Sequence, residues 1–186
     1  MGVVFPHVQD ANDAKAAVAI SKYPSKQDTF GGCRSMTGQL PAFSLQPTKL
    51  SDVIEQSNSQ ASSVLLMIET KGSVEKIDEI AAVHGVDVLL VGTNDLSIEL
   101  GSPGDFRSPV FRAALENISR ACKKYGRVMG VAGIYGDRDF HDWAIHVLGV
   151  GFMLGQQDSG ILLTGAVKCA AEIEDAESHS TVTNGH

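Results

Sequence analysis

Short apolar runs alternate with amphipathic segments along most of the chain. We expect five strands, because five runs of mainly β-branched and aliphatic residues end at turn signals. These runs span residues 3–5, 62–68, 86–91, 128–131 and 150–154. They are nearly continuously apolar, which is typical of strands in a parallel sheet that is covered by helices.

Five further segments repeat their apolar residues at the helical period. The expected helices span residues 11–21, 74–84, 138–148 and 159–173, and another starts at Ser108 with Pro109 in its first turn. Asp10, Ser73 and Asp137 stand at the positions of N-caps. From residue 175 onward the chain is rich in polar residues. We therefore expect one domain over residues 1–174 and a disordered tail over 175–186.

The alternation of strands and helices indicates an α/β fold with a parallel sheet. In such folds ligands bind at the carboxyl ends of the strands, so the residues that follow each strand are the candidates for chemistry. Residues 24–50 form a polar, glycine-rich stretch. Since structureless segments of that length are uncommon in compact domains, we expect this one to be functional.

Composition narrows the classes of partner. The formal charge is −7 and no basic cluster is present, which argues against a nucleic-acid ligand. No apolar run approaches the roughly 20 residues of a membrane helix, and the first eight residues lack the pattern of a signal peptide. The three widely spaced cysteines favour a reducing, cytoplasmic location, with Cys122 and Cys169 as small core residues.

Two carboxylates follow neighbouring strands of the expected sheet. Glu69 comes directly after the second strand, and Asp95 comes after the turn Gly92-Thr93-Asn94 that ends the third. Two such charges in one cleft repel each other unless a cation lies between them. Oxygen ligands favour Mg²⁺ or Mn²⁺, and the main-chain N–H groups of a glycine turn can bind a carboxylate. Alternatively, both acids are solvated strand-end or capping residues.

Four segments in a fixed order carry a resemblance to a known family. Residues 67–70 read Met-Ile-Glu-Thr and residues 91–97 read Val-Gly-Thr-Asn-Asp-Leu-Ser; Gly2–Val8 and Arg34–Pro41 precede them. Together they resemble the hydroxy-oxo-heptanedioate aldolase and citrate lyase β-type family, and within it the fungal macrophomate synthase group. The resemblance covers residues 2 to about 172. It implies a (β/α)₈ TIM barrel of the phosphoenolpyruvate/pyruvate superfamily.

The resemblance also implies an activity and a set of site residues. The family members are metal-dependent carbon–carbon lyases that form a pyruvate enolate from oxaloacetate or a hydroxy-oxo acid. Glu69 and Asp95 match the two ligands of the divalent cation, Mg²⁺ or Mn²⁺. Gly92, Thr93 and Asn94 match the turn that binds the substrate carboxylate, and His7 matches a histidine that contacts substrate. Arg34 lies in the matching loop, where it binds a second carboxylate or is a solvated arginine.

The chain also departs from the family pattern. A closed barrel takes roughly 250 residues, and these 186 residues supply about five of the eight βα units, matching strands four to eight. We therefore expect an incomplete, N-terminally shortened barrel without the family's general-base histidine and its strand-three arginine.

Two other functional classes stay open. One is a non-catalytic homologue that retains metal or carboxylate binding. The other is a phosphoenolpyruvate-utilising domain, although residues 128–137 lack the cysteine of that class. An open sheet exposes an edge and apolar surface, so we expect a homo-oligomer or pairing with a full-length relative.

Overall fold

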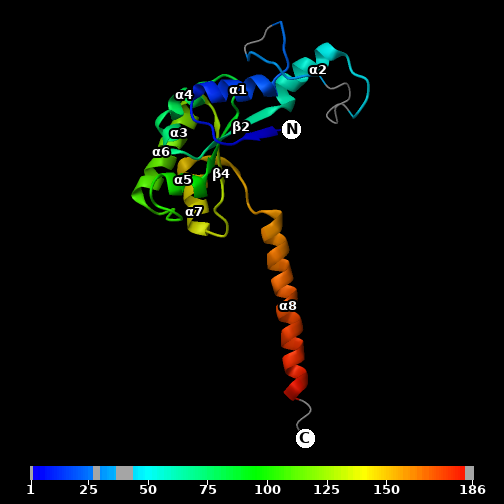
Figure 1. Cartoon of the computed structure of the whole chain (residues 1–186), viewed down its shortest axis with the longest axis vertical. Coiled ribbons are helices and arrows are strands. Elements are labelled where there is room, and N and C mark those ends of the chain that lie inside the picture. Colours follow the sequence, from blue (N-terminus) through cyan, green and yellow to red (C-terminus); the bar gives the residue numbers. More distant parts are fainter. Residues whose placement is uncertain (1, 27–29, 37–43, 183–186) are drawn as a thin grey trace. The chain divides into compact units, whose positions relative to one another are not determined.

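The computed structural model describes residues 2–26, 30–36 and 44–182. The chain divides into two compact units, Met1–Met153 and Leu154–His186. The first contains the sheet and the candidate site, and the second contains one long helix (Figure 1).

The first unit is built on a five-stranded sheet. Its strands are β1 (Gly2–Phe5), β2 (Ser63–Ile68), β3 (Val88–Gly92), β4 (Val128–Ala132) and β5 (Val150–Met153). All neighbouring pairs are parallel, and the spatial order β1-β2-β3-β4-β5 follows the chain. A doubly wound sheet reverses its strand order, whereas a (β/α)₈ barrel adds each strand beside the last. The topology is therefore that of a partial barrel, which confirms the expected fold class.

Helices connect successive strands. They are α1 (Ala11–Ser21), α2 (Leu50–Gln56), α3 (Lys71–Glu75), α4 (Ile77–Ala81), α5 (Thr93–Glu99), α6 (Pro109–Tyr125) and α7 (Arg138–Trp143). Two π-helical turns, η2 (Ser57–Ala61) and η3 (Ala144–Leu148), continue α2 and α7. Asp10, Ser108 and Asp137 cap α1, α6 and α7 through their side chains, as the sequence predicts.

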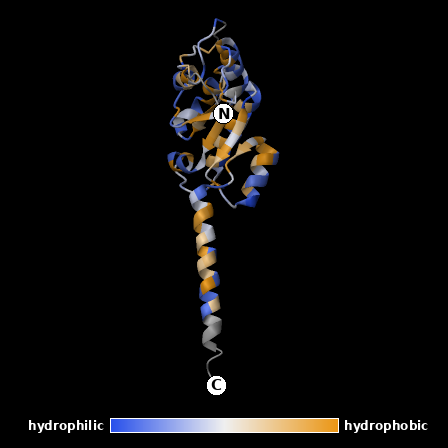
Figure 2. Ribbon diagram, turned by 90° about the vertical axis from the view of Figure 1, so that its right-hand side faces the viewer, coloured by the Kyte–Doolittle hydropathy of each residue, from blue (hydrophilic) through white to orange (hydrophobic). Residues whose placement is uncertain are grey.

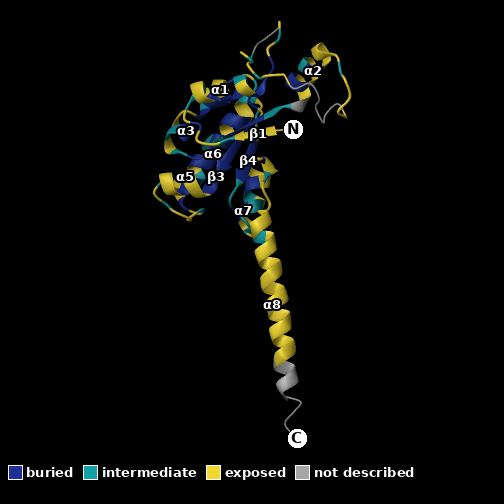
Figure 3. Cartoon of the chain, turned by 45° about the vertical axis from the view of Figure 1, so that its right-hand side comes forward, coloured by how far each residue is buried: buried dark blue, intermediate teal, exposed yellow. Residues whose placement is uncertain are grey.

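The two faces of the sheet are both apolar but belong to different clusters. In β2, Val64, Leu66 and Ile68 join the large core between sheet and helices, whereas Leu65 belongs to a small cluster on the opposite face with Leu90. This alternation follows from the two-residue period of a strand. It explains why the strands read as continuous apolar runs. Figure 2 shows the strands of the sheet as mainly hydrophobic, and Figure 3 shows β3 and β4 as mainly buried.

The helix expected over residues 74–84 is different in the structure. Its N-cap is Thr70, three residues before the predicted cap, and Thr70 and Ser73 form a reciprocal capping box. The backbone leaves helical geometry at Lys76, with φ −100° and ψ 17°, which separates α3 from α4. Ser73 was therefore assigned wrongly as the cap, because serine at the cap position and at the third helical position gives the same local signal.

The polar stretch 24–50 has no helix or strand in its described parts before Leu50. Helix α2 and turn η2, which follow it, were not predicted. Thr37–Pro41 of the segment Arg34–Pro41 lies outside the described residues.

The second unit consists mainly of α8 (Asp158–Val182). The helix continues through residues 175–182, where the sequence indicated a disordered tail. Cys169, expected in a core, is exposed, whereas Cys122 is buried. Burial raises the pKa of the Cys122 thiol to about 12. No helix among the described residues is both long and apolar enough to cross a membrane.

Candidate functional site

The carboxyl ends of the first four strands lie along one edge of the sheet. His7 follows β1, Glu69 directly follows β2, Thr93 directly follows β3 and Gly133 directly follows β4. Because neighbouring strands are parallel and in register, with Ile68 beside Val91, these residues are brought to the same edge. This edge is where the sequence predicted the site.

Glu69 is buried at this edge, with only 3% of its surface exposed. The main-chain N–H of His7 donates to its Oε1 at 2.6 Å, and Nδ1 of the same histidine lies 2.9 Å from that oxygen. A buried carboxylate needs such partners, because burial without them carries a large desolvation cost. His7 itself is largely exposed, with 82% of its side-chain surface accessible.

The backbone of His7 is left-handed, with φ of 58°. For a residue other than glycine this conformation costs roughly 1–2 kcal/mol. The strain is local to the turn between β1 and α1, and it accompanies the N–H contact with Glu69. Strained backbone of this kind is typical of positions where a side chain or main-chain group must be aimed.

Gly92, at the end of β3, lies against the other oxygen of Glu69. A Cβ at this position would lie 3.0 Å from Glu69 Oε2 and 3.0 Å from Met67 Cε. The φ of Gly92 is −84°, which any residue can adopt. Glycine is therefore needed at this position because it lacks a side chain, and its freedom to adopt unusual backbone angles is not used. Gly92 thus leaves space beside the Glu69 carboxylate.

The turn after β3 is anchored to the end of β4. Thr93 is fully buried, and its Oγ1 donates to the carbonyl oxygen of Ala132 at 2.8 Å. Gly133 has a φ of +107°, and a Cβ there would lie 2.6 Å from Thr93 Oγ1 and 3.1 Å from Asn94 Nδ2. A glycine at position 133 therefore permits the close contact that holds Thr93 and Asn94 in place.

Asp95 lies in the first turn of α5 and is exposed. Together with Glu69 it supplies two hard oxygen donors from adjacent strand ends. Mg²⁺ is commonly bound through one or two carboxylates, with water and substrate as its other ligands, so this donor set fits such a cation. Within residues 2–26, 30–36 and 44–182 no group of three or more His, Cys, Asp or Glu residues could hold a metal.

The structure does not bring Arg34 to this edge. Its main-chain N–H donates to the carbonyl of Lys22 at 3.0 Å, and its guanidinium lies 4.6 Å from the centre of the Tyr23 ring. The Nζ of Lys22 donates to Ser62, just before β2 begins. Arg34 is thus located at the amino end of the strands, opposite to Glu69, because α1 runs back along the sheet. For the next strand to be parallel to the last, the helix between them must return the chain to the amino ends of the strands.

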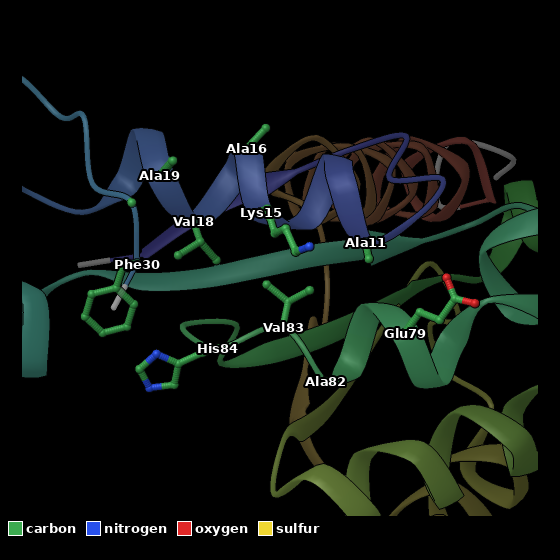
Figure 4. A pocket seen from close by; sticks show the side chains of 11 residues that line it. Ala11, Lys15, Ala16, Val18, Ala19, Phe30, Glu79, Ala82, Val83 and His84 are labelled. Carbon is green, nitrogen blue, oxygen red and sulfur yellow. The ribbon is translucent and has the colours of Figure 1, made fainter. Parts of the chain in front are cut away.

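One cavity lies beside this edge, and a larger one lies away from it. The first, of about 260 Å³, is lined by the residues around His7 and by one side of α1, from Asp13 to Ile20. The second, of about 750 Å³, lies between α1 and the residues that follow α4, where Phe30 stacks on His84 at 4.7 Å (Figure 4). The larger cavity contains none of the predicted site residues, so it does not define the candidate site.

Two residues at the site were not singled out from the sequence. Gly133 directly follows a strand, and that position is the one signal in the sequence that could have indicated close backbone packing there. Met67 lies in β2 two residues before Glu69, and its Cε approaches the same place beside Gly92 as Glu69 Oε2 does. Neither residue type carries chemistry, which is why a search for chemical groups passed over both.

Comparison with known proteins gives a consistent match. The HpcH/HpaI aldolase/citrate lyase family matches residues 1–157. A 4-hydroxy-4-methyl-2-oxoglutarate aldolase of Chaetomium globosum is 51% identical over 173 residues, which cover 93% of this chain and 62% of that protein. The chain therefore spans less than two thirds of this curated relative.

Solved structures agree on the fold. The HpcH/HpaI aldolase of Desulfitobacterium hafniense superposes with a TM-score of 0.80 at 29% identity, over 93% of this chain and 63% of that one. Macrophomate synthase superposes with a TM-score of 0.68 at 21% identity, over 94% of this chain and 60% of that one. At this identity the second likeness concerns the fold alone.

Proposed function

Since the chain belongs to the HpcH/HpaI aldolase/citrate lyase family, we propose that it acts in the metal-dependent cleavage of a carbon–carbon bond in a small oxo-acid. The observation that carries this proposal is the meeting of Glu69, Gly92 and Thr93 at the carboxyl edge of the sheet. The similarity to the 4-hydroxy-4-methyl-2-oxoglutarate aldolase named above supports, as the substrate, an oxo-acid whose cleavage releases pyruvate. The family match favours this function over that of a phosphoenolpyruvate-utilising domain.

Each site residue has a distinct role in the proposal. Glu69 and Asp95 hold a divalent cation, Mg²⁺ or Mn²⁺, which when bound supplies Lewis-acid stabilisation of an enolate. The main chain of Gly92, Thr93 and Asn94 binds the substrate carboxylate, and the bond from Thr93 to Ala132 keeps this turn rigid. His7 lies exposed beside Glu69, where it can contact the substrate. Arg34 lies away from this edge, so we assign it no role in this proposal.

A second candidate function is binding without catalysis. Proton transfer needs a titratable group that is free to approach the substrate. Of the described histidines at this edge, His7 has its Nδ1 2.9 Å from Glu69 Oε1, and His141 has its Nε2 3.1 Å from the carbonyl oxygen of Ile134. This observation favours a chain that binds a cation and an oxo-acid but transfers protons slowly.

Pyruvate release separates the two candidates. The purified chain, treated with EDTA and then supplied with Mg²⁺ or Mn²⁺, is incubated with oxaloacetate or 4-hydroxy-4-methyl-2-oxoglutarate, and pyruvate is measured with lactate dehydrogenase. We expect release that requires the metal and falls to the protein-free rate in Glu69→Gln. The protein-free control contains the same metal, because divalent cations alone decarboxylate oxaloacetate. Release at the protein-free rate by a chain that binds Mn²⁺ would favour binding without catalysis.

We also propose that the chain forms a homo-oligomer. A lone helix cannot bury its apolar side chains, and α8 exposes several of them, namely Ile161, Leu162, Leu163, Val167 and Ile173. Exposed apolar residues in such number are typical of surfaces that pack against another chain. Light scattering coupled to gel filtration should give a mass of at least twice the 19.7 kDa of one chain. A single monomeric peak at micromolar concentration would contradict the proposal.

A further inference from the structure

The Glu69 carboxylate is contacted differently at its two oxygens. Within the part of the chain that the structure describes, both contacts of the carboxylate come from His7 and reach Oε1: the main-chain N–H donates a hydrogen bond, and Nδ1 forms an ion pair when the ring is protonated. The distances are 2.6 Å for the main-chain N–H and 2.9 Å for Nδ1. A hydrogen bond and an ion pair on the same oxygen favour one rotation of the carboxylate about its last bond, since turning it would lose both contacts.

The other oxygen faces a residue without a side chain. Oε2 lies 3.0 Å from the place where a Cβ of Gly92 would be, and the same place lies 3.1 Å from Glu69 Cβ. Any larger residue at position 92 must displace the carboxylate or Met67 Cε, which also lies 3.0 Å away. Gly92 therefore keeps the space beside Oε2 open.

We propose that His7 and Gly92 are positioning residues for Glu69, and that Oε2 is the oxygen that Glu69 offers to the divalent cation. His7 occupies Oε1 and sets the orientation of the carboxylate, while Gly92 places no side chain against Oε2. This inference rests on the proposed function, because it takes Glu69 as a ligand of the cation. It adds which atom binds and which two residues place that atom.

The residue type at position 7 fits the role of His7. A left-handed φ of 58° turns the N–H of His7 toward Glu69, 62 residues further along the chain. Asparagine adopts this conformation more readily than most residues, and its Nδ2 is the same number of bonds from Cα as the Nδ1 of histidine. Asparagine at position 7 should therefore preserve both contacts, whereas glycine should preserve only the one from the main chain.

Binding of Mn²⁺ alone, without substrate, tests the role of Gly92. Free Mn²⁺ is measured by its electron paramagnetic resonance signal as protein is added, so the readout does not depend on turnover. We expect Gly92→Ala to weaken binding by about tenfold or more, in the range usual for residues that orient a metal ligand. The matched control is Gly72→Ala at the same edge, where a Cβ would meet Gln9 Oε1 at an ordinary 3.7 Å. The control should bind as the unaltered chain does.

The same measurement tests His7 without adding bulk to the site. His7→Gly removes the ring and keeps the main-chain N–H, and we expect about tenfold weaker binding. His7→Asn should recover affinity to within about threefold of the unaltered chain. A merely structural role for the ring would not predict this recovery. Circular dichroism of each variant shows whether it folds, and if Gly92→Ala does not, the two His7 variants decide.

The outcomes separate this inference from the proposed function. If Glu69→Gln loses Mn²⁺ binding while Gly92→Ala and His7→Gly bind normally, the positioning roles are wrong and the cation site stands. If Glu69→Gln binds as well as the unaltered chain, or if the unaltered chain does not bind Mn²⁺, both the cation site and the positioning roles are overturned. Weakened binding in Gly92→Ala and His7→Gly, with normal binding in Gly72→Ala and recovery in His7→Asn, supports the inference.

Discussion

Replacing Glu69 and Asp95 together with alanine is expected to weaken Mn²⁺ binding by about 100-fold or more. A divalent cation with few protein ligands depends on carboxylate charge, and about 100-fold corresponds to roughly 2.7 kcal/mol for the loss of two ligands. Glu69 is the larger contributor in this account, because it is buried and held by His7, whereas Asp95 is exposed. Titration followed by the paramagnetic resonance of free Mn²⁺ gives the dissociation constant directly.

The control for this experiment removes the same charge elsewhere. Glu75 and Glu99 are exposed carboxylates on α3 and α5. Their double replacement by alanine lowers the net negative charge equally but leaves both proposed ligands in place. We expect Mn²⁺ affinity within about twofold of the unaltered chain, because exposed charges are strongly screened. Equal affinity in the Glu69, Asp95 double variant and the unaltered chain would refute the assignment of these two residues.

Phe111→Ala is expected to lower the free energy of unfolding by about 3–5 kcal/mol. The side chain is fully buried on the inner face of α6, where its ring lies 5.5 Å from that of Phe106. Removing it leaves a cavity in the large core that joins the helices to β2 and β3. Since a domain is stable by only about 5–15 kcal/mol, this single change takes away a large share of the stability.

Urea unfolding followed by circular dichroism measures the effect, and Val110→Ala is the matched control. Val110 precedes Phe111 in the same helix but is 47% exposed. Its replacement should change the free energy of unfolding by about 0.5 kcal/mol or less. Similar losses for the two variants would show that the inner face of α6 is not packed as the structure describes.

The candidate site depends on this packing. Helix α6 connects β3 to β4, and the contact between Thr93 and Ala132 joins the ends of those same strands. The core beneath these strand ends supports the turn that carries Gly92, Thr93 and Asn94 as long as the chain is folded. We therefore expect Phe111→Ala to weaken Mn²⁺ binding only to the extent that it unfolds the chain, whereas the changes at Glu69 and Asp95 act in the folded state.

The sequence alone determined the strands and most helices, and it predicted two carboxylates at adjacent strand ends. Strands appear as apolar runs, and caps such as Asp10, Ser108 and Asp137 act on residues two or three positions away. These are local effects, so they can be predicted from residues that are close together in the sequence. Glu69 and Asp95 were predicted because a parallel sheet places the residues after adjacent strands at one edge. The same local reasoning misassigned Ser73 as the cap, and it did not predict that α8 continues through residues 175–182.

Only the tertiary structure decided how the site residues meet. The bonds between His7 and Glu69 join positions 62 residues apart, and no local pattern predicts which oxygen they reach. Gly92 matters through the atoms that surround its missing Cβ, and Arg34 is excluded because α1 returns the chain to the opposite end of the sheet. Such contacts depend on how whole elements pack, and packing is specified by shape in three dimensions and not by the order of residues along one element.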